Sequence, residues 1–190
     1  MDFSAVILCG GKSRRMGRDK ALLPVEGEPL VLRQIRLLQT LKPAEIFLSV
    51  REDGVAGIEL PVGVSPLPDA YGECGPLGGI ATALENCSTA HVLVLAVDMP
   101  KLSSPVFGTL LEACDPGRGA IPRSSGGIEP LAAIYHRESL AVAREMLGEG
   151  RRSARGFAER CVGAGQAVFV DFSATGREEF TNWNRPEDLS

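Results

Sequence analysis

The residues best suited to chemistry form a basic loop near the start of the chain. Five cations lie between Lys12 and Lys20, at positions 12, 14, 15, 18 and 20, against the single acid Asp19. The loop opens with Gly10 and Gly11, which lack a Cβ and therefore let the backbone turn sharply and approach a ligand. In such a turn, backbone N–H groups can cradle phosphate oxygens while lysine and arginine neutralise their charge. We predict a polyphosphate site here; the alternative is a solvated basic turn.

Two common phosphate-binding loops do not fit this spacing. Gly11-Lys12-Ser13 looks like the end of a Walker A loop, but the first glycine of that motif would fall at Val6. The dinucleotide fingerprint G-x-G-x-x-G fails because Lys12 stands where its second glycine belongs. The pattern that remains is G-G-x-S-x-R-M-G-x-D-K-x-L-L-P, which ends at Pro24.

A carboxylate follows a second apolar run. Residues 91–97 are nearly all apolar and predict a central strand, which ends in Asp98-Met99-Pro100. The carboxyl ends of parallel strands line the crevice in which open α/β sheets bind ligands. Asp98 offers hard oxygen atoms that suit Mg²⁺, although a turn or capping role beside Pro100 is the structural alternative.

The elements that position these groups alternate between strand and helix patterns. We predict strands over 5–9, 45–50, 91–97, 119–122, 128–135 and 167–171. We predict helices over 29–42, 75–86, 103–113 and 137–147, a short one ending near 160, and an irregular segment over 51–76. The strand-helix-strand order at the start predicts a parallel β-pair.

The loop pattern resembles the signature of the nucleotidyltransferases that activate sugars, isoprenoid precursors and molybdopterin. Its G-G and Asp-Lys pairs are similar to those of the MobA-like branch, the molybdenum cofactor guanylyltransferases. The resemblance implies one Rossmann-like α/β domain over residues 1–190. We expect three αβα layers and a mostly parallel sheet, of the nucleotide-diphospho-sugar transferase type. It also implies transfer of GMP from GTP to the terminal phosphate of molybdopterin, with release of pyrophosphate.

The same resemblance assigns roles to individual residues. Arg14 and Lys20 would stabilise charge on the reacting phosphates, and Asp98 would hold Mg²⁺, the expected cofactor. The implied nucleotide-binding residues are Leu8, Cys9, Gly10, Gly11, Lys20, Asp69, Gly75 and Asp98.

Asp69 matches the acid that this family places before a G-P-L-[AG]-G helix start. Guanine presents its N1–H and 2-amino donors side by side, and one carboxylate can accept both. Spacing alone favours a turn-forming role for Asp69, and only the resemblance favours the base contact.

The C-terminal residues 180–189 resemble the family ending F-x-N-x-N-x-P-E-[ED]-L. The resemblance implies that Asn182 and Asn184 bind molybdopterin, and Asn184 also suits a helix N-cap. The basic residues Arg151, Arg152 and Arg155 form either a solvated face or a site for the acceptor's phosphate.

Two rival functions remain at this point. A related nucleotidyltransferase could use CTP or UTP on another phosphorylated acceptor, and a catalytically silent nucleotide-binding module is the alternative from another class. One departure concerns the second strand, where the family commonly carries asparagine and this chain has Ser49-Val50-Arg51.

Composition limits the partners. A net charge of −4 argues against nucleic acid as a general partner, and no apolar run reaches the ~18 residues of a membrane span. Five cysteines without a C-x-x-C pair argue against a disulfide framework or a zinc site. We therefore expect a cytoplasmic enzyme with GTP and molybdopterin as substrates and transient contacts with other molybdenum-cofactor proteins.

Overall fold

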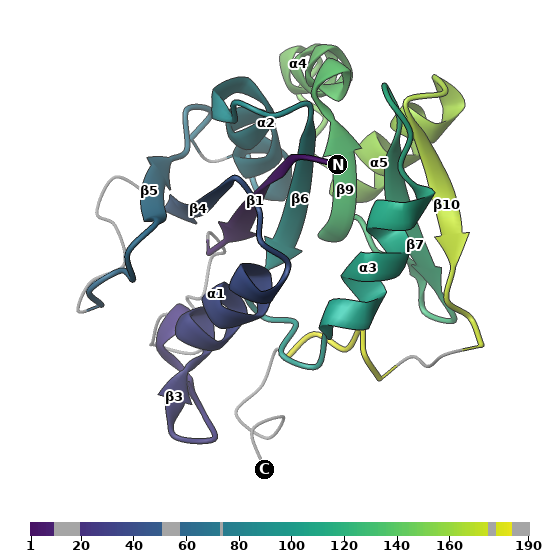
Figure 1. Ribbon diagram of the computed structural model, residues 1–190. Helices are drawn as coiled ribbons and strands as arrows, with labels where there is room; N and C mark the ends of the chain where they lie inside the picture. The colour runs from purple at the N-terminus through teal and green to yellow at the C-terminus, as the bar shows by residue number, and fades with distance from the viewer. Residues whose placement is uncertain (10–19, 51–57, 73, 175–177, 184–190) are drawn as a thin grey trace.

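A mixed β-sheet forms the centre of the protein, as the computed structural model in Figure 1 shows. The structure describes residues 1–9, 20–50, 58–72, 74–174 and 178–183. The strand order is β10-β7-β9-β6-β1-β4-β5. The strands are β1 (Phe3–Leu8), β4 (Glu45–Val50), β5 (Val64–Pro68), β6 (His91–Ala96), β7 (Gly119–Ser124), β9 (Ala132–His136) and β10 (Ala167–Asp171). Outside this order, β8 (Gly127–Ile128) pairs with β7, and β2 (Pro24–Val25) pairs with β3 (Glu28–Pro29).

Most of these strands run in the same direction. β1 pairs in parallel with both β4 and β6, β4 with β5, and β10 with β7. β9 runs antiparallel to its neighbours β6 and β7. The predicted mostly parallel sheet is confirmed, and the carboxyl ends of β5, β4, β1 and β6 meet at one edge.

Helices cover both faces of the sheet. α1 (Leu30–Thr40) and α3 (Ser104–Ala113) pack on one face in a core that takes Ala5 and Ile7 from β1. α2 (Pro76–Asn86), α4 (Leu140–Gly148) and α5 (Ala154–Gly163) pack on the other face, in a core that takes Val6 and Leu8. Successive residues of a strand point to opposite faces, so a strand covered on both sides is apolar throughout. The predicted αβα layers are therefore confirmed.

Two predicted elements differ from the structure. The segment 51–76 is not wholly irregular, because it contains β5. Pro66 and Pro68 lack backbone N–H groups and therefore argue against a strand in the sequence. They are tolerated here because β5 is an edge strand. The predicted strand 128–135 is two strands, because a turn closed by the Ala132 N–H and the Glu129 carbonyl (3.3 Å) separates β8 from β9.

The helix predicted over 137–147 starts later than expected. Residues Arg137–Ser139 form a 3-10 turn, and α4 begins at Leu140. Its apolar spacing predicts Leu140, Ala143 and Leu147 on the inner side; Ala143 is buried, Leu140 and Leu147 are half-buried, and Met146 is the other buried side chain.

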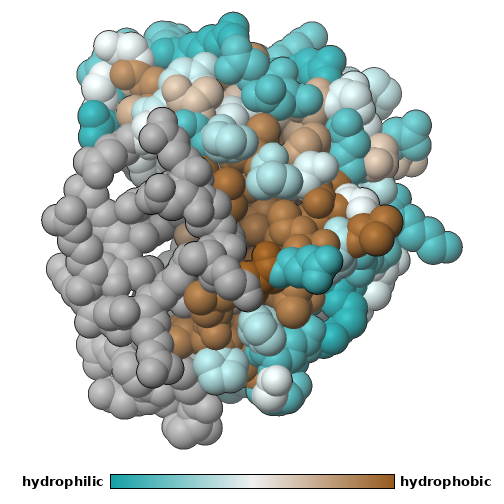
Figure 2. All heavy atoms as spheres, turned by 90° about the vertical axis from the view of Figure 1, so that its left-hand side faces the viewer, coloured by the Kyte–Doolittle hydropathy of each residue, from teal (hydrophilic) through white to brown (hydrophobic). Residues whose placement is uncertain are grey.

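The sheet ends at β5. Figure 2 views the molecule from this side and shows apolar residues gathered near the middle of the described part of the face. None of the helices in the described part of the chain has the length and apolar character needed to cross a membrane.

Candidate nucleotide and metal site

The end of the basic loop meets the carboxylate that follows β6. Lys20 begins a 3-10 turn (Lys20–Leu22), and its Nζ donates to Asp98 Oδ2 at 3.1 Å. The two side chains are 20% and 23% exposed, so the pair is partly shielded yet accessible to a ligand. Lys20 and Asp98 are 78 residues apart in the sequence, but their side chains meet at the carboxyl ends of the parallel strands.

The chain around Asp98 is held firmly by backbone contacts. Gln34, which is buried on α1, donates from Nε2 to the carbonyl oxygens of Val97 (3.3 Å) and Met99 (2.8 Å). The Trp183 N–H donates to the Asp98 carbonyl at 2.8 Å. Because the backbone of Asp98 and of both its neighbours is hydrogen-bonded, the position of its Cα, and so the origin of its carboxylate side chain, is fixed.

Asp98 suits a metal that needs few protein ligands. Among the described residues, no group of three or more His, Cys, Asp or Glu side chains could hold a metal ion. Mg²⁺ commonly takes one or two carboxylates and completes its shell with water and substrate phosphates. A single accessible carboxylate beside Lys20 fits that preference.

Asp69 lies just beyond β5 and is fixed through one carboxylate oxygen. Its N–H donates to the Val50 carbonyl at 3.1 Å. Its Oδ1 accepts from the Tyr71 N–H (2.9 Å) and lies 3.3 Å from the Thr82 hydroxyl. Within the described residues, Oδ2 has no hydrogen-bond partner, so this oxygen can accept from a ligand.

Glycines bring the start of α2 against these groups. A Cβ at Gly78 would lie 3.1 Å from both carboxylate oxygens of Asp69. A Cβ at Gly79 would lie 3.0 Å from Leu8 Cδ2 and from Ser49 Oγ. Gly75, the residue before the helix, has φ +67°, which L side chains rarely adopt. The positive end of the helix therefore approaches Asp69 and the end of β1 closely.

Leu8 and Cys9 lie at the end of β1, with their backbones engaged by neighbouring segments. The Leu8 carbonyl accepts from the Val97 N–H, and the Cys9 N–H donates to the Ser49 carbonyl, each at 3.2 Å. The Leu8 side chain is buried against α2. Ser49, at the position where the family commonly has asparagine, is buried as well.

The remaining predicted site residues divide into two groups. Arg14, Gly10, Gly11 and Asn184 lie outside the described residues. Asn182 is exposed and adjoins Trp183, whose N–H donates to the backbone carbonyl of Asp98, so the C-terminal segment passes beside Asp98.

The C-terminal segment is anchored a few residues before Asn182. Phe180 is buried and makes an edge-on ring contact with Phe172, with centroids 5.6 Å apart. Glu179 accepts from the Ser103 hydroxyl at 2.9 Å. These contacts attach the tail to the edge of the sheet.

Strand order fixes how the two acids relate. Asp69 follows β5 and Asp98 follows β6, with β4 and β1 between them. Three steps at the usual spacing of neighbouring strands amount to about 14 Å. An extended mononucleotide could therefore lie along this edge with its base at one acid and its phosphates at the other.

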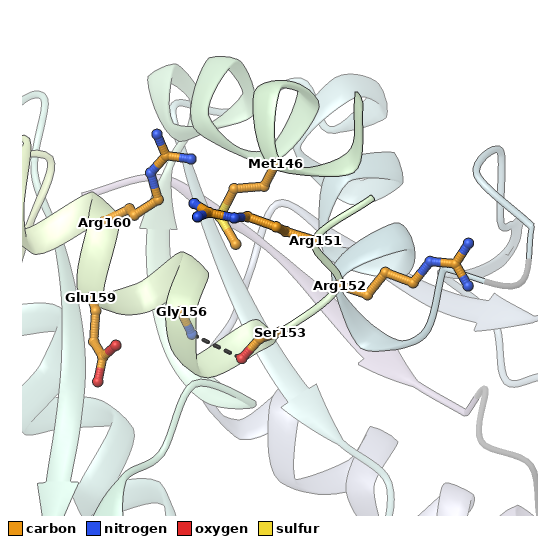
Figure 3. A pocket seen from close by; sticks show the side chains of 7 residues that line it. All are labelled: Met146, Arg151, Arg152, Ser153, Gly156, Glu159 and Arg160. Atoms are coloured by element: carbon orange, nitrogen blue, oxygen red, sulfur yellow. Dashed lines mark hydrogen bonds between the residues drawn. The ribbon is translucent and has the colours of Figure 1, made fainter. Parts of the chain in front are cut away.

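Of the predicted basic cluster, Arg151 and Arg152 but not Arg155 line a pocket of about 540 Å³ between α4 and α5 (Figure 3). Its lining consists of Met146, Arg151, Arg152, Ser153, Gly156, Glu159 and Arg160. Arg151 lies 3.5 Å from Glu149, and Arg160 donates to Glu145 at 2.7 Å. In Figure 3, Arg152 points away from the other labelled side chains. The glutamate partners favour the solvated-face alternative over a dedicated phosphate site.

Sequence reasoning missed Gln34 and Thr82, which support the two acids. Both are buried polar residues on otherwise apolar helix faces. A polar residue at a core position of a helix was the available signal, because a buried polar group needs a partner.

Comparison with known proteins identifies the class. The chain matches the MobA-like NTP transferase domain over residues 5–164 and belongs to that family. It is 38% identical to a probable molybdenum cofactor guanylyltransferase of Opitutus terrae, over 97% of this chain and 92% of the relative. It is 33% identical to the molybdenum cofactor guanylyltransferase of Xanthomonas euvesicatoria pv. vesicatoria, over 99% of this chain and 93% of the relative.

Solved structures share the fold. The molybdopterin-guanine dinucleotide biosynthesis protein A of Archaeoglobus fulgidus superposes with a TM-score of 0.72 at 22% identity, covering 98% of this chain and 94% of that chain. A 2-C-methyl-D-erythritol 4-phosphate cytidylyltransferase from Thermus thermophilus gives 0.70 at 22% identity, covering 100% and 96%. The same fold therefore serves transferases that use different nucleotides.

Proposed function

We propose that this chain is a molybdenum cofactor guanylyltransferase. It transfers GMP from GTP to the terminal phosphate of molybdopterin, giving the guanine dinucleotide cofactor and pyrophosphate. The contact between Lys20 Nζ and Asp98 Oδ2 carries the proposal, because it joins the basic loop to the expected metal carboxylate. The near full-length similarity to named guanylyltransferases supports the choice of reaction.

The transfer needs alignment and charge neutralisation more than a protein nucleophile. The acceptor phosphate is already an anion at neutral pH, so the enzyme must hold it in line with the α-phosphorus of GTP. Lys20, with Arg14 from the loop, neutralises charge on the transferring and leaving phosphates. Asp98 would hold Mg²⁺, and the ion would supply further neutralisation of the phosphate charge.

Asp69 selects the base. The Tyr71 N–H fixes its Oδ1, and its Oδ2 has no partner within the described residues. A carboxylate held in this way can accept from the N1–H and the 2-amino group of guanine, a donor pair that adenine and cytosine do not present. The start of α2, which follows Gly75, brings the positive end of the helix dipole to the same nucleotide.

Asn182 and Asn184 contact the acceptor from the C-terminal tail. The bond from the Trp183 N–H to Asp98 supports this assignment, because it holds Asn182 beside the metal carboxylate. Residues 1–190 act as one nucleotidyltransferase domain in the cytoplasm, with transient contacts to other molybdenum-cofactor proteins.

Pyrophosphate release tests this function. The purified protein is incubated with Mg²⁺ and with GTP, CTP, ATP or UTP in turn, with and without molybdopterin. We expect release with GTP and molybdopterin together. Release with CTP or UTP instead would favour the rival nucleotidyltransferase, and no release with any phosphorylated acceptor would favour a silent binding module.

A further inference from the structure

We propose that Glu129 recognises the pterin edge of the acceptor, by the same pairing that Asp69 offers to guanine. The proposal rests on the proposed function, because it takes molybdopterin as the acceptor. A pterin carries an N3–H and a 2-amino group side by side, which is the donor pattern of guanine. One carboxylate can accept both donors in either molecule.

Glu129 lies at the same end of the sheet as Asp98. β6 and β9 are antiparallel with Leu95 opposite Ala132, and the Ala96 N–H continues this pairing to the Leu131 carbonyl at 2.7 Å. On the amino-terminal side of Leu131 the chain turns away from β6, and the Glu129 N–H donates to the Pro122 carbonyl of β7 at 3.0 Å. Glu129 therefore lies beside the end of β7, on the side of β6 away from Asp69.

The carboxylate of Glu129 is held through one oxygen. The Ser124 hydroxyl donates to Oε1 at 2.7 Å, and Ser124 Oγ itself accepts from the Gly126 N–H at 2.9 Å. Within the described part of the chain, Oε2 has no hydrogen-bond partner. Asp69 and Glu129 are thus alike: in each, the protein bonds to one carboxylate oxygen, and the other oxygen can accept hydrogen bonds from a ligand.

The surroundings of Glu129 do not favour its charge. Burial raises the pKa of Glu129, and the hydrogen bond from Ser124 lowers it only in part. No ion pair reaches Glu129 from the described residues. A half-buried carboxylate without a cation is costly to the fold, and N–H donors from a ligand would relieve that cost.

The spacing suits an acceptor that lies opposite to the nucleotide. Ser124, which holds the carboxylate, ends β7, and β7 lies two strands from β6 in the sheet. Two strand spacings amount to about 10 Å. Asp69 lies on the other side of Asp98. The transferred phosphate would therefore lie between two acids, one for guanine and one for the pterin.

The main experiment measures the Michaelis constants of the Glu129→Gln variant. Glutamine keeps the shape of the side chain, and its amide oxygen can still accept from the Ser124 hydroxyl. Its amide NH₂ group replaces Oε2 and would face the N–H donors of the ligand. We expect the KM for molybdopterin to rise about 10-fold or more, with the KM for GTP unchanged. Glu159→Gln, on the exposed surface of α5, is the matched control and should keep both constants.

A second readout tests the donor pair itself. 6-Hydroxymethylpterin and 6-hydroxymethyllumazine differ at position 2, where the lumazine has an oxo group in place of the amino donor. Wild-type enzyme should be inhibited more strongly by the pterin, and Glu129→Gln should lose that preference. A merely structural role for Glu129 would not change this ratio.

Three results distinguish the possible failures. An unchanged molybdopterin KM in Glu129→Gln would overturn this inference and leave the proposed function intact. An equal rise in both Michaelis constants would also overturn it, because general distortion would explain the effect. Wild-type protein that releases no pyrophosphate from GTP with molybdopterin would instead refute the proposed function, and this inference with it.

Discussion

The two edges of the β-sheet use their polar side chains in different ways. At the amino-terminal edge they bond to one another and to the backbone: Glu45 Oε2 accepts from the Ser4 hydroxyl (2.7 Å) and the Ser88 N–H (2.9 Å). His91 Nε2 lies 3.1 Å from the Asp115 carbonyl. At the carboxyl-terminal edge, the acids are held through the backbone or one oxygen, and part of each carboxylate stays available.

The pKa values of two glutamates express this difference. Although burial acts against it, hydrogen bonds from Ser4 and Ser88 lower the pKa of Glu45. Burial raises the pKa of Glu129. Folding therefore favours the charged form of Glu45 and disfavours that of Glu129. The first acid serves the stability of the fold, whereas the second opposes it, as is common for residues kept for binding.

The largest effect should come from Asp98→Ala. Loss of this carboxylate removes the metal ligand and the partner of Lys20, so turnover should fall by about 100-fold or more. Pyrophosphate release at saturating GTP measures it, and Asp115→Ala, at the opposite edge, is the control that should stay active. Near wild-type turnover of Asp98→Ala in excess Mg²⁺ would show that the metal assignment is wrong.

The next effect should come from Asp69→Asn. The amide replaces one accepting oxygen by a donor, which opposes the donor pair of guanine. The preference for GTP over ATP, measured as the ratio of kcat/KM values, should fall by about 10- to 100-fold. If that ratio is unchanged, the base is read elsewhere.

A smaller effect should come from Thr82→Val. The buried Thr82 hydroxyl accepts from the Ala70 N–H at 3.1 Å and lies 3.3 Å from Asp69 Oδ1, so it supports the turn that carries Asp69. Its loss should raise the KM for GTP about 5-fold, with kcat nearly constant, since one hydrogen bond contributes about 1 kcal/mol. Thr82→Ser, which keeps the hydroxyl, should restore the wild-type KM. An unaltered KM for GTP in Thr82→Val would show that Thr82 does not support the binding of the nucleotide.

The smallest effect should come from Glu45→Gln, and it should concern stability alone. Because folding lowers the pKa of Glu45, its contribution is present above the ordinary pKa of a glutamate and is lost as the pH falls through the lower, folded value. At pH 7 the variant should unfold about 2 °C below the wild type, with normal turnover. The gap should close under acid conditions. A loss of activity without a loss of stability would contradict the division between the two edges.

The sequence was sufficient to predict most of the architecture. Buried strands such as β1 and β6 are continuous apolar runs, and Asp98 follows directly after one of them. β5 was not predicted because its prolines break the usual strand pattern and only its edge position makes them acceptable. The position of Gln34 on an apolar helix face shows that it needs a partner, but which distant segment supplies that partner, for Gln34 as for Glu129, depends on the packing of the whole chain.

The contact between the tail and Asp98 has a practical consequence. Trp183 is the chain's one tryptophan, and its backbone N–H is bonded to the Asp98 carbonyl. Its indole fluorescence therefore comes from a single position at the rim of the site. A fluorescence change on addition of nucleotide or acceptor, followed by stopped flow, would therefore report an event at this one position without any label.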